Sequence, residues 1–214
     1  MTPTGVRVFL VVPVTWHWYF EARRKYSIAW YAKRALDVAD AFSPGAGVDV
    51  FLYGKKDGED HTSVLRTELK PAGLESWVKD WAVRPNGDPG PLDDLRPTNP
   101  QEDFFGTKKE RSYPGPVAAV EEVLKWTEQL TGDKLIIFWL DSNIEKEELV
   151  RTIARADRSD IFWQFFGDGD KLSYSFWRKD GLERGGLVPN IWTRRDRSWS
   201  RRSITRGFRK WRNR

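Results

Sequence analysis

The sequence has no cysteine, only two histidines and no long apolar run. Without cysteine the chain can form no disulfide and no thiolate metal site, which is compatible with a reducing compartment. No apolar run approaches the roughly 18 residues that a membrane-spanning helix needs. Residues 1–7 also lack the apolar core of a signal peptide. We therefore expect a cytoplasmic protein without a membrane span.

Patterns typical of enzymes are scarce as well. His17 lies in an aromatic segment without a serine or cysteine nucleophile motif, and His61 lies in a charged turn. The adjacent carboxylates at positions 93–94 and 121–122 are neighbours in sequence, so their side chains point apart and make poor acid–base couples. We predict no catalytic residue, no cofactor and no enzymatic activity.

Aromatic and basic residues are abundant. Twelve tryptophans and twelve phenylalanines, with 39% apolar residues overall, are enough for a sizeable core. The net charge of +5 hides an asymmetry: residues 193–214 carry nine arginines and one lysine against one aspartate, a net +9. The other 192 residues hold 26 basic and 30 acidic side chains, a net −4. A basic end on a slightly acidic body indicates an anionic partner, or an acidic surface of the same chain.

Apolar runs alternate with helical patterns along the chain. The central one, Leu135–Leu140, is apolar throughout, as a strand buried on both faces would be. Similar runs at Val6–Val12, Val48–Tyr53 and Ile161–Phe166 are separated by amphipathic segments, of which Glu21–Phe42 is the longest. This alternation predicts the α/β class, with a doubly wound, mostly parallel central sheet flanked by helices.

The domain organisation follows from changes in composition. Ser63–Leu69 alternates weakly, as an edge strand would, and residues 84–116 are rich in proline. We expect one α/β domain over residues 1–192, with an insertion loop over 84–116. A basic C-terminal helix within 193–214 would close the domain or form a tail.

One segment resembles a known family. Residues 159–169 read SDIFWQFFGDG, which resembles a strand of the von Willebrand factor A domain of the tellurium-resistance, TerF-like type, where it reads Pro-Ile-Phe-Trp-Gln-Phe-Val-Gly. The segments VRVFLVV, VDVFLYG, SYPGPVAAVEEVL, LIIFWLDS and GGLVPNIW resemble other parts of the family in the matching order. The resemblance implies a von Willebrand A or Rossmann-like fold and a bacterial stress-response or conflict-system setting.

The same family usually carries a metal-ion-dependent adhesion site. An Asp-x-Ser-x-Ser motif after the first strand, a loop threonine and an aspartate after the fourth strand supply oxygen ligands suited to Mg²⁺. The resemblance places these vestigial metal-site positions at Pro13, Thr15, His17, Arg111, Ser112 and Asp141. Because few oxygen donors remain and an arginine adjoins them, we predict that the metal site is degenerate and binds no ion.

The carboxyl edge of the predicted sheet is the candidate binding surface. Asp141 follows the central strand, at the edge where open α/β sheets bind ligands. The aromatic cluster Trp16–Phe20 follows the first strand at the same edge; it either packs beneath the insertion or forms a hot spot for another protein. The predicted partner-binding residues are Trp16, His17, Trp18, Tyr19, Tyr113 and Asp141.

The basic C-terminal segment, residues 193–214, has several interpretations. Residues 201–211 place Ile204, Phe208 and Trp211 on one helical face. If that face docks, the arginines are solvated or paired with the acidic body; otherwise nucleic acid, an anionic membrane or an acidic protein could be the partner. The candidate contacts are Arg194, Arg195, Arg197, Arg201, Arg202, Arg206, Arg209, Lys210 and Arg212.

The leading hypothesis is a non-enzymatic protein–protein interaction or adaptor module that acts in a multi-component complex. Two alternatives stay open. One is a nucleic-acid-associated protein that acts through its arginine-rich C-terminus, and the other is a metal-dependent adhesion domain with substituted ligands.

Overall fold

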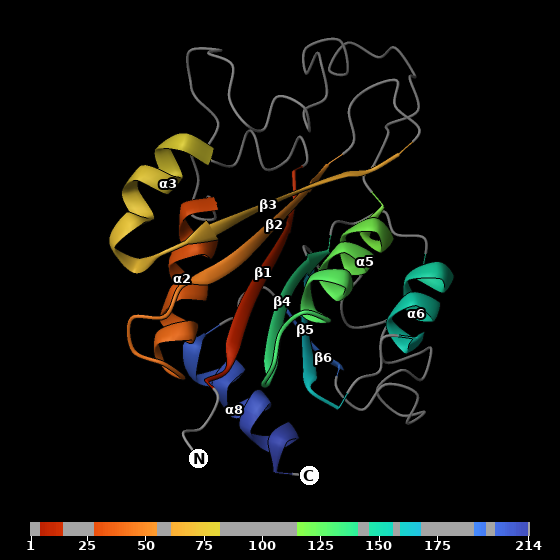
Figure 1. Ribbon diagram of the computed structural model, residues 1–214. Helices are drawn as coiled ribbons and strands as arrows, with labels where there is room; N and C mark the ends of the chain where they lie inside the picture. Colours follow the sequence, from red (N-terminus) through yellow and green to blue (C-terminus); the bar gives the residue numbers. More distant parts are fainter. Residues whose placement is uncertain are drawn as a thin grey trace.

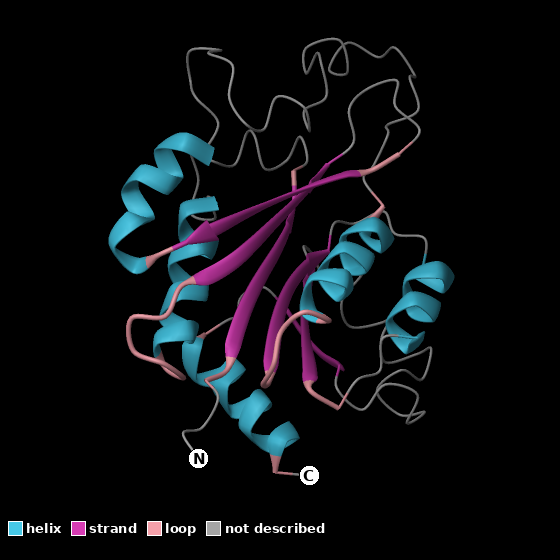
Figure 2. Cartoon of the chain, in the orientation of Figure 1, coloured by secondary structure: helices cyan, strands magenta, loops and turns pink. Residues whose placement is uncertain are grey.

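The computed structural model describes residues 5–14, 28–54, 61–81, 115–140, 146–155, 159–167, 191–195 and 200–213. A six-stranded sheet in the order β3-β2-β1-β4-β5-β6 forms its centre (Figure 2). Neighbouring strands pair in parallel except β2 and β3, which are antiparallel. The strands are β1 Arg7–Pro13, β2 Val48–Gly54, β3 Ser63–Leu69, β4 Lys134–Leu140, β5 Ile161–Gly167 and β6 Ile191–Arg195.

Helices cover both faces of the sheet (Figure 1). One face packs against α2 Ile28–Asp40, α3 Leu74–Trp81 (preceded by the 3₁₀ turn η1, Pro71–Gly73) and α8 Arg201–Arg212. The other packs against α5 Pro116–Thr127 and α6 Lys146–Arg155. Alternate residues of β1, β2, β4 and β5 contribute to these two cores, which explains the continuous apolar runs of those strands. The predicted doubly wound, mostly parallel α/β fold is confirmed.

Strand β4 occupies the middle of the sheet, between β1 and β5, and all seven of its residues are buried. This confirms the expectation for Leu135–Leu140. Strand β3 lies at one edge and is largely half-exposed, as its weak alternation predicted.

The sequence pattern predicts a helix that begins at Pro116 and runs to Leu130, and the observed helix α5 begins at Pro116 but ends at Thr127. The pattern predicts that Val117, Val120, Leu124 and Thr127 form the buried face of this helix. Val120 and Thr127 are buried, whereas Val117 and Leu124 are half-buried, and Ala119 and Val123 are fully buried in addition. The helix therefore has two neighbouring apolar stripes, and the one that includes Ala119 and Val123 is the more deeply buried.

The C-terminal segment is part of the packed domain. Residues 193–195 belong to strand β6, and the helix begins at Arg201. On α8, Ile204 and Phe208 are almost fully buried, and the Phe208 ring lies 4.9 Å from that of Phe42 and 5.8 Å from that of Phe162. Helix α8 therefore closes one face of the sheet. Within the described segments, no helix combines the length and apolar character needed to cross a bilayer.

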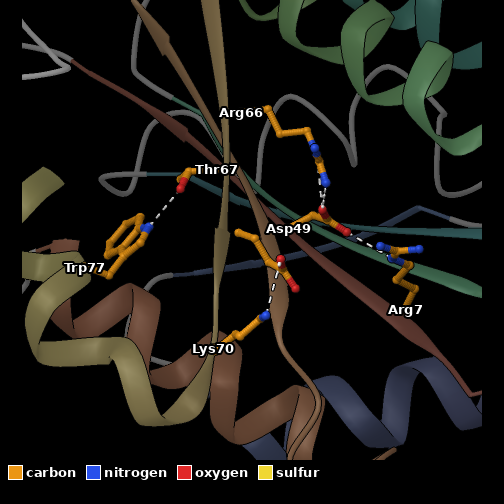
Figure 3. A network of polar contacts seen from close by, with 7 residues as sticks. Arg7, Asp49, Arg66, Thr67, Lys70 and Trp77 are labelled. Atoms are coloured by element: carbon orange, nitrogen blue, oxygen red, sulfur yellow. Dashed lines mark hydrogen bonds and ion pairs between the residues drawn. The ribbon is translucent and has the colours of Figure 1, made fainter.

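A buried carboxylate holds three strands together. The side chain of Asp49 on β2 is 4% exposed and accepts hydrogen bonds from Arg7 Nε at 3.0 Å and Arg66 Nη2 at 2.6 Å. Figure 3 shows the two guanidinium groups approaching it from different sides. The Arg66 guanidinium also lies 3.5 Å from the ring centroid of Trp126 on α5. Because the charge of Asp49 is paired twice, we assign it a structural role.

Candidate functional site

The centre of the sheet contains a topological switch point. Strand β1 leads to α2 on one face, and its neighbour β4 leads to α6 on the opposite face. In open α/β sheets the crevice beyond the carboxyl ends of two such strands binds ligands. The described residues at this position are Pro13 at the end of β1, Val14 directly after it, and Trp139 and Leu140 at the end of β4.

Pro13 ends the pairing between β1 and β4. That ladder stops at Val11 and Phe138, while β1 stays paired with β2 as far as Pro13 and Tyr53. The backbone N–H of Arg7 donates to the carbonyl of the residue before β4, at 2.9 Å. Because every second residue of a strand faces the same neighbour, the nitrogen of Pro13 also faces β4. Proline has no N–H to donate, so the two strands part here.

Tyr53 replaces the missing donor. In the β1–β4 register, an N–H at position 13 would point at the carbonyl of Trp139. That carbonyl instead accepts a hydrogen bond of 2.9 Å from the hydroxyl of Tyr53, a side chain from β2 that is 1% exposed. The N–H of Val14 donates to the carbonyl of Tyr53 at 2.7 Å, which fixes the direction in which the chain leaves β1. Sequence reasoning missed Tyr53; its only signal is a polar group at the end of an apolar strand.

Aromatic side chains support this edge from both faces. On the α2 face, the ring of Trp139 lies 4.5 Å from Tyr31 and stacks with Phe166 at 6.1 Å. On the α5 face, Tyr53 and Phe138 are in ring contact at 5.7 Å. The described part of the edge is therefore buried and largely apolar.

Few of the predicted edge residues lie in the described part of the chain. Pro13 is described, but its ring supplies no oxygen ligand, and the Tyr53 hydroxyl is already used by Trp139. Among the residues with a described position, no three His, Cys, Asp or Glu side chains gather closely enough to hold a metal ion. The other predicted residues lie outside the described segments: Thr15, Trp16, His17, Trp18, Tyr19, Arg111, Ser112, Tyr113 and Asp141.

A second candidate surface lies at the opposite end of the sheet. Helix α8 runs past the amino ends of the strands, whereas the switch point is at their carboxyl ends (Figure 1). Arg212 Nε lies 2.9 Å from a carboxylate oxygen of Asp133, the residue directly before β4. Arg201 Nη2 lies 3.8 Å from Asp40, the last residue of α2. These ion pairs attach α8 to the amino edge.

The ion pairs divide the predicted basic contacts into two groups. Arg201 and Arg212 pair with the acidic body, which is one of the arrangements that the sequence left open, and their contact with an anionic partner stays a prediction. Arg197 is not described, and Arg194 and Arg195 are placed only by their backbone in β6. Four exposed side chains of α8 have no acidic partner among the described residues. We call them the basic stripe: Arg202, Arg206, Arg209 and Lys210.

Comparisons with solved structures show a similarity of fold. The sequence matches no family model and no curated protein. Among solved structures, a von Willebrand factor type A protein from Catenulispora acidiphila aligns with 97% of this chain at 10% identity, with a TM-score of 0.43. The chain covers 42% of the length of that protein. At this level the similarity carries no argument about function, and the doubly wound assignment rests on the strand order and connections.

Proposed function

We propose that the chain is a non-enzymatic protein-interaction module that binds its partner at the switch point without a metal ion. The observation that supports this most directly is the backbone at Pro13. The position that the family resemblance assigns to the first metal-binding aspartate carries a residue with neither a side-chain oxygen nor an N–H. The strand end there is held by Tyr53.

The donor set argues against Mg²⁺. This ion requires near-octahedral oxygen coordination and loses its water reluctantly. With Pro13 and His17 at two donor positions, the resemblance leaves only Thr15, Ser112 and Asp141 as oxygen ligands. A single carboxylate among them is too little charge to offset dehydration, and Arg111 adds a competing positive charge.

Aromatic contact is the remaining means of binding. The segment after β1 contains Trp16, Trp18 and Tyr19, and it follows Val14, whose N–H donates a hydrogen bond to the Tyr53 carbonyl. Large aromatic side chains such as Trp and Tyr are typical of protein-binding hot spots. The partner would be another protein in a multi-component complex, and the TerF-like resemblance suggests a bacterial stress-response system.

Isothermal titration with Mg²⁺ tests the metal-free part of the proposal. We expect no binding heat from the unmodified chain and none from Asp141→Ala. Tight binding that Asp141→Ala abolishes would instead identify a metal-dependent adhesion domain with substituted ligands.

Affinity capture on the immobilised full chain tests the interaction. The captured protein is identified and then titrated against variants in the presence of a chelator. We expect Trp16→Ala to weaken binding by more than about 10-fold, the loss typical of an aromatic hot spot. The control Lys125→Ala, an exposed residue of α5, should bind normally. Equal binding by Trp16→Ala and the control would refute the proposed surface.

A further inference from the structure

The basic stripe lies on the side of α8 opposite its buried face. Arg202, Arg206 and Arg209 follow one another at steps of four and three residues, the spacing of one helical face. The buried residues of the helix, centred on Ile204 and Phe208, face the sheet. Helix α8 itself contains no acidic residue, so no carboxylate of the helix interrupts the stripe.

Helix stability does not account for this arrangement. Cations stabilise the C-terminal turn of a helix and destabilise the N-terminal turn, because of the helix dipole. Arg209 and Lys210 lie in the last turn, where they are favourable. The first turn, however, has arginine at 201 and 202 and no acidic residue, and Arg202 has no acidic partner among the described residues. The charge at Arg202 works against the helix, which points to a role outside the fold.

The burial of α8 limits what can bind to it. An amphipathic helix that lies on a membrane inserts its apolar face into the lipid. On α8 that face is already occupied, since Ile204 and Phe208 are 0–1% exposed and Trp211 is 9% exposed. Only the charged side of the helix is available to a partner.

We infer that the basic stripe binds the phosphate backbone of nucleic acid without reading the bases. Three of its four members are arginines, whose planar guanidinium groups bind phosphate in a bidentate manner. At 1.5 Å per residue, Arg202 to Arg209 span about 10 Å, a length over which one strand of a duplex carries about three phosphates. The stripe lies at the end of the sheet opposite the switch point, so this inference does not depend on the proposed protein-binding edge.

Fluorescence anisotropy with the full chain and a labelled duplex of mixed sequence provides the test, over about 50–200 mM salt. The triple variant Arg202→Ala, Arg206→Ala and Arg209→Ala should bind on the order of 100-fold more weakly near 0.1 M salt. The slope of log affinity against log salt should fall by about 2–3, because each phosphate contact contributes about 0.9. Thermal unfolding should change little, because all three side chains are exposed and the helix-dipole effects of removing Arg202 and Arg209 have opposite signs.

A matched control removes the same charge elsewhere. Lys33, Lys70 and Lys125 are exposed, and their triple alanine variant has the same net charge as the arginine variant. Its affinity should stay within about 3-fold of the unmodified chain, because charges beyond about 8 Å are screened at physiological salt. An equal loss in both variants, or no loss in the arginine variant, would overturn the inference. Displacement of the duplex by polyglutamate at equal charge concentration would also overturn it, in favour of an acidic protein.

Arg202→Glu separates a binding role from a structural one. An acidic residue in the first turn favours the helix dipole, so the unfolding midpoint should rise by about 1–4 °C. Binding of the same labelled duplex should weaken at the same time. If this variant lowers the unfolding midpoint and leaves nucleic-acid affinity intact, Arg202 serves the fold and the inference fails.

Discussion

The hydrogen bond from Tyr53 to the Trp139 carbonyl predicts an energetic coupling between Tyr53 and Pro13. Tyr53→Phe removes the hydroxyl and leaves the carbonyl of a residue that is only 4% exposed without this donor. An average hydrogen bond contributes about 0.5–1.5 kcal/mol, and an unsatisfied buried acceptor costs about 1–3 kcal/mol. We expect Tyr53→Phe to lower the free energy of unfolding by about 1–2 kcal/mol. This corresponds to roughly 2–8 °C in the unfolding midpoint.

Pro13→Ala should remove most of this cost. The substitution supplies a backbone N–H at the position that faces β4, where it can donate to the Trp139 carbonyl. In the Pro13→Ala background, Tyr53→Phe should therefore cost less than about 0.5 kcal/mol. The difference between the two backgrounds, on the order of 1 kcal/mol, is the coupling energy.

Urea unfolding of four proteins measures the coupling: the unmodified chain, the two single variants and the double variant. Any effect of Pro13→Ala on its own, such as a more flexible unfolded chain, cancels in the double-mutant cycle. If Tyr53→Phe costs the same in both backgrounds, the Tyr53 hydroxyl does not replace a ladder hydrogen bond, and our account of the switch point is wrong.

Three further predictions concern the unfolding midpoint in urea. Asp49→Ala should lower stability by about 1–3 kcal/mol, since two partly solvated arginines lose their shared carboxylate; an unchanged midpoint would contradict this. Gly47→Ala should cost about 1–3 kcal/mol, because the new Cβ would lie 2.9 Å from the Leu69 carbonyl oxygen. Gly73→Ala, with its nearest atom at 3.8 Å, should cost clearly less. Phe208→Ala should cost about 3–5 kcal/mol, whereas a solvated C-terminal tail would lose nothing.

Local sequence patterns were sufficient to predict most of the described fold. The apolar run at 135–140 predicted a central strand, because only a strand covered on both faces has no polar side. Pro116 marked the start of α5, since its missing N–H costs nothing in the first turn. The periodicity of residues 201–211 likewise predicted the buried face of α8, including Phe208.

The candidate surfaces depended on contacts between distant residues. The strand register decides whether the nitrogen of Pro13 faces β2 or β4. The Tyr53 hydroxyl, which replaces the missing N–H of Pro13, is 86 positions away in the chain from the Trp139 carbonyl. Composition identified a basic end, but only the docking of α8 against Asp40 and Asp133 distinguished the arginines that pair with a carboxylate from those that have no acidic partner among the described residues. The sequence by itself thus determined which segments are strands and helices, because burial leaves a periodic pattern in the side chains. The tertiary structure alone decided which polar groups contact one another and which stay exposed, because periodic patterns in the sequence do not show which segments become neighbours in space.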